Sequence, residues 1–448
     1  MFSPGEKGKK GLKNHSLTTA NYINQKYNKF VVQQLCRTTV VSEMICMLQI
    51  GAPALGEDFH DRTRELETLK KRILSTSILL TAPRRFGKTS LLRKFEKQMK
   101  EERYNVIYLD VMHVYSPERF VHELALAAYD EASIRDKFLQ NIKEIFKKLA
   151  GALNIEGSVP GASIKLELSR ILESEVNEKT WQDHGREIIK SITASSEKTP
   201  VIIILDELPE AVANMSREDR DALGFLQWFR SIRQSIDNIR FIVAGSTSFE
   251  NVVKSISKRG SYINDLHRID LSGFSYDDAM EFLKKAFKDE ELPFSEDVGR
   301  RILELVGEPY VPYFLAVFVG LISEELREVS EPDAILNSLE ELYWSKLLGN
   351  EGSRYFQDYW DRLRIYYSEY LTPVREILNE ASKSDEGIRV DTAKEIFIKY
   401  TELSSEEVND KFNVIIKDLE NDFYLQRRGE YLVFQSKLMK DWWRLNHG

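Results

Sequence analysis

The chain has 448 residues, of which 42% are hydrophobic and 30% are charged, and its formal net charge is −8 at pH 7. This composition is typical of a folded protein with roughly two to four domains, and the acidic balance does not indicate a large basic surface for nucleic acid. No apolar run reaches the ~18 residues of a membrane-spanning helix. Two cysteines cannot form a structural zinc site alone. We therefore expect a cytoplasmic protein with no membrane partner.

Residues 1–55 differ from the rest of the chain. Up to Arg37 they contain seven Lys or Arg residues after Glu6, which is the single acid of that stretch. We interpret the segment as a flexible basic extension. The alternatives are a basic arm that contacts nucleic acid and an acid-poor targeting peptide. A secretory signal is disfavoured, because no compact apolar segment with a small-residue cleavage site is present.

A phosphate-binding loop is predicted between an apolar strand, 77–81, and a helix that includes 90–96. Gly87 lets the backbone approach a phosphate chain, Lys88 would reach the β- and γ-phosphates, and the Thr89 hydroxyl would bind Mg²⁺. The residues expected to bind the nucleotide here are Ala82, Pro83, Arg84, Arg85, Phe86, Gly87, Lys88, Thr89 and Ser90. Ala82 stands where the usual pattern has its first glycine.

The strand and helix pattern continues after the loop. Helical spacing predicts a helix over 62–73 before it, and a strand at 105–110 and a helix at 117–130 follow it. This βαβα order predicts a parallel sheet with helices on both faces. Residues 131–198 interrupt the order, and we interpret them as an insertion. In it, turn residues followed by Ile164, Leu166 and Leu168 predict a small hairpin, and a helix is expected over 181–193.

A second acidic motif ends the most apolar strand of the chain, 201–205. Asp206 and Glu207 follow it directly, at the strand end that faces the nucleotide in P-loop enzymes. Asp206 would hold Mg²⁺ through its water shell, and Glu207 would orient or deprotonate the attacking water. The alternative is a strand capped by surface acids.

Two more strands complete an expected five-stranded sheet. The strand 239–246 ends in Ser246, whose hydroxyl could bind the water or the γ-phosphate, and a short strand covers 267–271. Between the acidic motif and Ser246, Arg230 and Arg233 share one face of a helix. An arginine finger cannot be assigned among the four candidates Arg230, Arg233, Arg259 and Arg268.

Helices follow from residue 272. We expect an ATPase core over 56–271, a helical lid over 272–350 and a winged helix over 351–448. In the lid, the turn that contains Pro309 could approach the adenine. In the last domain we expect one helix over 354–382, or two that are broken near 372–373.

The rest of the last domain has the pattern of a winged helix. A helix is expected at 390–400, and Ser404 with Glu407 forms a capping box for the next helix. A hairpin follows, with its turn at Arg428-Gly429. Arg427 and Arg428 are the best candidates for contacts to DNA phosphates. Acids outnumber bases from residue 355 onward, so packing or protein contact remains the alternative.

Several of these motifs together resemble the archaeal-type P-loop ATPases, which lie near the AAA+ and STAND classes. The resemblance rests on residues 82–92, the strand and acids at 201–207, and shorter matches at 225–230, 263–266, 311–314 and 441–444. It implies an ASCE core with strand order 5-1-4-3-2, a helical lid, a winged helix, and binding of ATP and Mg²⁺ with slow, switch-like hydrolysis. Members usually have Gly-Arg where this chain has Asp61-Arg62, so Arg62 alone carries over as a nucleotide contact.

The main functional hypothesis is an ATP-hydrolysing switch in which Glu207, Lys88 and Ser246 are catalytic, and Thr89 and Asp206 bind the metal. The alternative is an initiator or regulator that binds DNA under the control of ATP. A third reading is an interaction scaffold of the defence or toxin-antitoxin type with weak ATPase activity. A protein partner and a homo-oligomer are compatible with each of them.

Overall fold

Five parallel strands form the central sheet in the order β2-β3-β4-β1-β5. This is the predicted order, with its ends exchanged. The strands are β1 (Ile78–Thr81), β2 (Val106–Asp110), β3 (Val201–Asp206), β4 (Ile239–Gly245) and β5 (His267–Asp270). All six residues of β3 are buried, as expected for a strand covered on both faces.

The structure is a computed structural model, and it describes residues 62–145, 161–196, 199–246, 248–257 and 260–448. The predicted extension 1–55 and the turn residues 157–160 lie outside these ranges. Every described residue belongs to one unit of the chain, 48–448. Within the described part, no helix is both long and apolar enough to cross a membrane.

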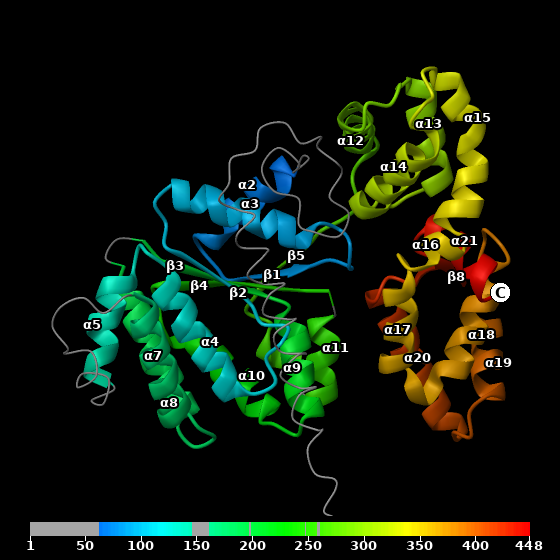
Figure 1. Ribbon diagram of the computed structural model, residues 1–448. Helices are drawn as coiled ribbons and strands as arrows, with labels where there is room; N and C mark the ends of the chain where they lie inside the picture. Colours follow the sequence, from blue (N-terminus) through cyan, green and yellow to red (C-terminus); the bar gives the residue numbers. More distant parts are fainter. Residues whose placement is uncertain (1–61, 146–160, 197–198, 247, 258–259) are drawn as a thin grey trace, which may run out of the picture. The chain divides into compact units, whose positions relative to one another are not determined.

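Helices cover the two faces of the sheet (Figure 1). One face carries α2 (Thr63–Ile73) and α3 (Lys88–Glu101). The opposite face carries α4 (Pro117–Asp130), α5 (Arg135–Ile145), α7 (Gly161–Glu175), α8 (Trp181–Ala194), α9 (Leu208–Arg217), α10 (Ala222–Ser235) and α11 (Phe249–Ile256). Alternate residues of one strand serve the two cores, since Ile202 and Ile204 pack under α3 while Ile203 and Leu205 pack on the other side.

The predicted hairpin in the insertion is wrong, because residues 161–175 form the helix α7. Leu168 and Leu172 are fully buried, whereas Leu166 is 54% exposed. Ile164, Leu168 and Leu172 recur every four residues and therefore line one helical face. The alternation of 164, 166 and 168 is a coincidence within this longer helical pattern.

The helical part after β5 begins with two capped helices. They are α12 (Tyr276–Asp289) and α13 (Glu296–Val306), capped by Ser275 and Ser295. The helices α14 (Pro312–Leu326) and α15 (Pro332–Leu342) follow, then a π-helical turn (Tyr343–Leu347) and the short α16 (Asn350–Ser353). Both α14 and α15 start at a proline, which suits a first helical position because the missing N–H has no partner there.

The C-terminal elements are helices and a three-stranded antiparallel sheet in the order β6-β8-β7. Their bounds are α17 (Gln357–Tyr366), a 3-10 turn (Ser368–Tyr370), α18 (Leu371–Ser382), β6 (Ile388–Arg389), α19 (Val390–Lys399), α20 (Ser405–Asn421), β7 (Leu425–Arg428), β8 (Tyr431–Phe434) and α21 (Lys437–Asn446). The helices, the hairpin and the Ser404–Glu407 capping box follow the predicted order. The assignment of a winged helix to these elements stays a prediction.

Two details of the C-terminal prediction need correction. The helix 354–382 is broken at 367–370 rather than at 372–373, because Pro373 lies in the first turn of α18, where proline is tolerated. The hairpin turn is Gly429-Glu430, since Arg428 still pairs with Tyr431. Gly429 has a φ of 61°, a conformation that glycine adopts without strain. The strand β6, only two residues long, has no sequence signal of its own.

Candidate active site

The loop between β1 and α3 is fixed by its own backbone and by one buried ring. Gly87 has a φ of 82° and ends the loop, and α3 begins at Lys88. The Phe86 side chain is 1% exposed and packs edge-on against Phe423, with the ring centroids 5.1 Å apart. Ala82 is buried in the core below the loop, which explains why alanine is accepted there. The N–H groups of the first helical turn lack partners within the helix and can bind an anion.

Asp206, at the end of β3, lies beside the start of α3. Its Oδ2 atom accepts hydrogen bonds from the Thr89 hydroxyl at 2.9 Å and from the Tyr108 hydroxyl at 2.6 Å. Its Oδ1 atom is buried and has no hydrogen-bond partner among the described residues. Burial raises the pKa of Asp206 above its ordinary value, although Lys88, Tyr108 and Thr89 each oppose this.

Glu207 lies one residue further and is held by two groups. Its Oε1 atom is 3.3 Å from the Lys88 ammonium, and its Oε2 atom accepts hydrogen bonds from the backbone N–H and the hydroxyl of Ser246, at 3.0 and 3.1 Å. Burial alone would raise the pKa of Glu207, but Lys88, Ser246 and Arg84 lower it below its ordinary value. Glu207 has a φ of 60°, a strained conformation for this residue that directs the chain from β3 into α9.

The structure therefore brings five of the predicted site residues together, namely Lys88, Thr89, Asp206, Glu207 and Ser246. The described residues contain no cluster of three or more His, Cys, Asp or Glu that could hold a metal by themselves. Mg²⁺ does not need such a cluster, because it commonly binds one or two protein ligands together with water and substrate phosphates. The Thr89 hydroxyl and the unpartnered Oδ1 atom of Asp206 fit that donor set.

Arg62 and Pro309 are the two predicted nucleotide contacts outside the phosphate-binding loop, and both are connected to the segment that follows β5. The Arg62 guanidinium is buried and donates hydrogen bonds to the backbone oxygens of Phe86 at 3.2 Å and Ser272 at 2.8 Å. It thus ties the loop to the segment after β5. Pro309 precedes Tyr310, whose backbone oxygen accepts a hydrogen bond from the Phe274 N–H at 2.9 Å. The turn is therefore attached to the same segment that Arg62 binds.

The arginines considered as fingers are engaged within the chain. The Arg233 guanidinium forms an ion pair with Asp265 at 2.8 Å, and Arg230 donates a hydrogen bond to the backbone oxygen of Ser261. Both hold the segment 261–265. Arg268 pairs with Glu250 at 2.7 Å. Arg259 lies outside the described residues.

Sequence reasoning missed the contribution of α17. Asp358 forms ion pairs with Arg85 at 2.9 Å and Arg84 at 3.7 Å. One turn later, Arg362 donates a hydrogen bond to the backbone oxygen of Ser246 at 3.1 Å. The Tyr366 hydroxyl then donates to Glu210 of α9 at 2.6 Å. The spacing of these residues indicates a helix but gives no sign of which distant residues it contacts.

The chain is similar to a known protein family and to solved structures. A family model described as an ATPase domain predominantly from Archaea matches residues 59–311, which is more than half of the chain. Among solved structures, the Walker-type ATPase PABY2304 of Pyrococcus abyssi is similar with a TM-score of 0.58 and 17% identity, over 89% of this chain and 99% of that one. No curated protein matches the chain.

A second solved structure is less similar. It is the ORC2 protein of Aeropyrum pernix in ADPNP–ADP complexes, with a TM-score of 0.46 and 11% identity, over 86% of this chain and 95% of that one. At 17% identity, the similarity to the Pyrococcus protein supports the fold alone.

Proposed function

The chain belongs to the family of ATPase domains found predominantly in Archaea, and on this premise we propose that it is a slow, Mg²⁺-dependent ATPase that works as a conformational switch. The observation that carries the proposal is two side-chain contacts at the end of the sheet. Thr89 is hydrogen-bonded to Asp206, and Lys88 is hydrogen-bonded to Glu207. Each pair joins the phosphate-binding loop to the acidic motif. The family is that of P-loop ATPases.

Each residue has a distinct role in this proposal. Lys88 and the N–H groups at the start of α3 bind the phosphates, and the Thr89 hydroxyl and Asp206 would hold Mg²⁺. Bound Mg²⁺ supplies charge neutralisation for the β- and γ-phosphates. Glu207 orients the attacking water and accepts its proton, and Ser246 fixes the Glu207 carboxylate. In the nucleotide-free chain, Lys88, Ser246 and Arg84 hold the pKa of Glu207 below its ordinary value, so its carboxylate is ionised at neutral pH.

Slow turnover is supported by the way Glu207 is held. Both of its carboxylate oxygens are occupied, one by Lys88 and one by Ser246. Lys88 must leave the Oε1 atom of Glu207 to bind the phosphates, and only then can this oxygen accept a hydrogen bond from the water. This step costs a hydrogen bond between two charged groups, so the reactive arrangement is populated only after ATP has displaced that contact.

The switch is supported by the contacts that α17 makes with the same site. Asp358 holds Arg84 and Arg85 of the phosphate-binding loop, and Arg362 holds the backbone of Ser246. An ATP phosphate chain would compete with Asp358 for the two arginines. Because α17 is continuous with the C-terminal elements, this competition would change the equilibrium between two arrangements of that region.

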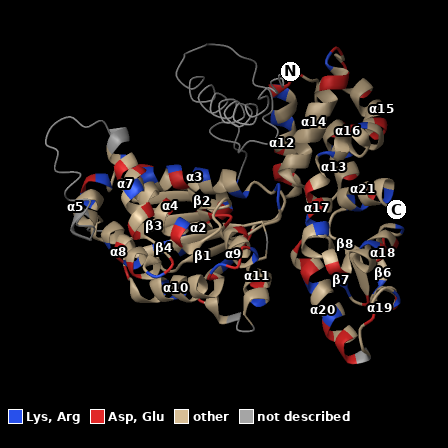
Figure 2. Ribbon diagram, turned by 60° about the horizontal axis from the view of Figure 1, so that its bottom comes forward, with Lys and Arg blue, Asp and Glu red and all other residues tan. Residues whose placement is uncertain are grey.

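A DNA-binding regulator is the second candidate, and one observation favours it. Arg427 and Arg428 are exposed at the end of β7, as phosphate contacts of a wing would be. Against it, Lys and Arg are interspersed with Asp and Glu along α20 and its neighbours (Figure 2). If this candidate is right, changing both arginines to alanine weakens salt-dependent binding of duplex DNA by the full chain. Unchanged DNA binding by the double variant would exclude the wing as the contact.

Equilibrium binding of ATP tests the main proposal. Lys88→Ala is expected to weaken binding at least a hundredfold, because the phosphate charge loses its buried partner. Lys97→Ala is the matched control, since Lys97 is on the same helix with its side chain 69% exposed. Equal ATP affinity of wild type and Lys88→Ala would contradict the phosphate-binding role of the loop.

A further inference from the structure

We propose that Tyr108 is a positioning residue that holds the Asp206 carboxylate in the orientation that binds Mg²⁺, and that Arg93 fixes the Tyr108 ring in turn. The inference rests on the proposed function, because it concerns the metal of the same site. Neither residue belongs to the phosphate-binding loop or to the acidic motif, and neither was expected from the sequence.

The sheet register places Tyr108 within reach of Asp206. Tyr108 of β2 pairs directly with Ile204 of β3, and Asp206 is two residues beyond Ile204 on the same face. A long aromatic side chain can span this diagonal between neighbouring strands. The Tyr108 hydroxyl accordingly lies 2.6 Å from the Oδ2 atom of Asp206.

The two oxygens of Asp206 are thereby given different roles. Oδ2 accepts hydrogen bonds from both Tyr108 and Thr89, whereas Oδ1 is buried without a partner among the described residues. A buried carboxylate oxygen without a partner is costly unless a ligand satisfies it. Tyr108 therefore leaves Oδ1 as the oxygen that accepts from the water shell of Mg²⁺.

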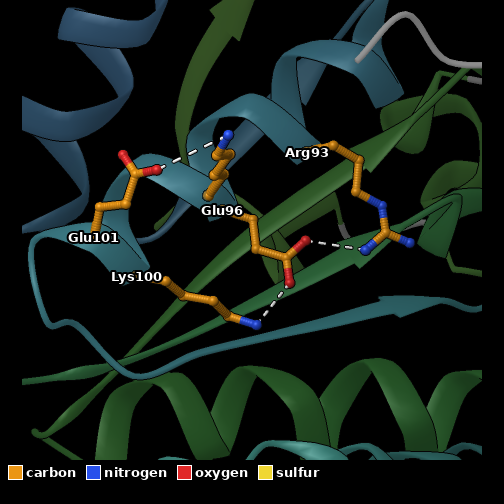
Figure 3. A pocket seen from close by; sticks show the side chains of 5 residues that line it. Arg93, Glu96, Lys100 and Glu101 are labelled. Atoms are coloured by element: carbon orange, nitrogen blue, oxygen red, sulfur yellow. Dashed lines mark hydrogen bonds and ion pairs between the residues drawn. The ribbon is translucent and has the colours of Figure 1, made fainter. Parts of the chain in front are cut away.

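Arg93 of α3 supports Tyr108 from its outer side. The guanidinium lies over the Tyr108 ring, with its central carbon 3.4 Å from the ring centroid. Arg93 is itself held by Glu96 at 2.9 Å, and Glu96 also binds Lys100 at 2.9 Å (Figure 3). These side chains line a pocket on α3 and satisfy one another there. The Arg93 guanidinium that covers the Tyr108 ring is thus held in place by Glu96.

Residues that do not bind the metal themselves can tune metal affinity by donating hydrogen bonds to a metal-binding carboxylate. Loss of such a hydrogen bond typically lowers the metal affinity 10–100-fold. Tyr108→Phe removes only the hydroxyl and keeps the ring under Arg93. We expect the Mg²⁺ concentration for half-maximal tight binding of a fluorescent ATP analogue to rise roughly tenfold. Binding of the same analogue in EDTA should be unchanged, because Lys88 and the loop are untouched.

Matched controls separate a positioning role from a general effect on packing. Tyr104→Phe removes a hydroxyl from another tyrosine that packs partly buried against the same core, and it should leave the Mg²⁺ requirement unchanged. Arg93→Met keeps an unbranched side chain but removes the charge over the Tyr108 ring. We expect the Mg²⁺ concentration for half-maximal binding to rise two- to fourfold in this variant. Lys97→Met on the same helix is its control.

The outcomes distinguish this inference from the proposed function. If wild type shows no Mg²⁺-dependent binding of the analogue, the proposed function fails. If wild type requires Mg²⁺ and Tyr108→Phe has the same half-maximal Mg²⁺ concentration, the inference is overturned while the proposed function stands. If Tyr108→Phe loses analogue binding equally in EDTA and in Mg²⁺, the inference is also overturned, because a looser fold weakens binding under both conditions. If Tyr108→Phe does not fold, Arg93→Met decides, and an unchanged Mg²⁺ requirement in that variant is the contradicting result.

Discussion

The Nη2 atom of Arg362 donates a hydrogen bond to the backbone oxygen of Ser246 at 3.1 Å, across 116 positions of the chain. Ser246 in turn donates two hydrogen bonds to Glu207, the candidate base. Arg362 also lies 3.9 Å from the carboxylate of Asp422, at the end of α20. One buried guanidinium therefore links the candidate catalytic residue to the C-terminal helices.

Arg362→Ala is expected to lower the free energy of unfolding by about 3–5 kcal/mol, because it leaves the Asp422 carboxylate, whose side chain is only 10% exposed, without its cation. Urea unfolding of the full chain measures this. Arg364→Ala, an exposed arginine on the same helix, is the control and should change it by less than about 0.5 kcal/mol. Equal losses in the two variants would contradict the role given to Arg362.

Asp358→Asn should strengthen ATP binding by two- to fivefold. The substitution removes a charge that holds Arg84 and Arg85 without removing either arginine, and a half-exposed ion pair of this kind contributes about 0.2–1 kcal/mol. Titration with a fluorescent ATP analogue measures the change, with Asp361→Asn on the same helix as the control. Weaker binding by Asp358→Asn would show that the carboxylate does not compete with the phosphates.

Asp418 makes stability depend on pH. Burial and the neighbouring Asp422 raise the pKa of Asp418 from 3.8 to about 6, against the opposing effect of Lys254, Lys411 and Lys417. The folded state thus holds this proton more tightly than the unfolded chain, so the stabilising contribution is complete below pH ~4 and is lost as the pH rises through ~6.

The variant Asp418→Asn should therefore be more stable than wild type at pH 7.5, by about 1 kcal/mol once solvent screening is allowed for. The difference should vanish at pH 4. Urea unfolding at the two pH values measures it, with Asp410→Asn on the same helix as the control. A constant difference at both pH values would contradict the raised pKa.

Arg62→Met is expected to lower the free energy of unfolding by about 2–3 kcal/mol in the absence of nucleotide. The substitution removes a buried cation that binds the backbone oxygens of Phe86 and Ser272. Thermal unfolding of the nucleotide-free chain measures this, with the exposed Arg64→Met as the control. A residue whose only partner was the nucleotide would show no loss under these conditions.

The core could be predicted because its signals are local. The strand at 78–81 is followed at once by the loop and α3, and β3 is a continuous apolar run that ends in Asp206. Parallel strands bring their carboxyl ends to one edge of the sheet, so the order of motifs along the chain was enough to expect Lys88, Glu207 and Ser246 near one another. The order of the five strands, which was expected from the family resemblance, is confirmed.

The remaining features depend on contacts between distant residues. The residues 164–168 taken alone fit both a strand and a helix, and the helical spacing appears only when the pattern is extended to Leu172, which is buried together with Leu168. Tyr108 looks like an ordinary strand residue until its hydroxyl is found on Asp206. Arg362 likewise looks like a surface arginine of an amphipathic helix. No local pattern encodes either partner, so a single sequence cannot reveal them.

Single-turnover hydrolysis of ATP by wild type and Glu207→Gln, measured beside their ATP affinities, tests the central claim most directly. We predict that wild type forms ADP and phosphate slowly, and that Glu207→Gln binds ATP with an affinity within a few-fold of wild type but hydrolyses it at least a hundredfold more slowly. Glu218→Gln, at an exposed site just after α9, should match wild type in both measurements. Hydrolysis by Glu207→Gln at the wild-type rate would contradict the account.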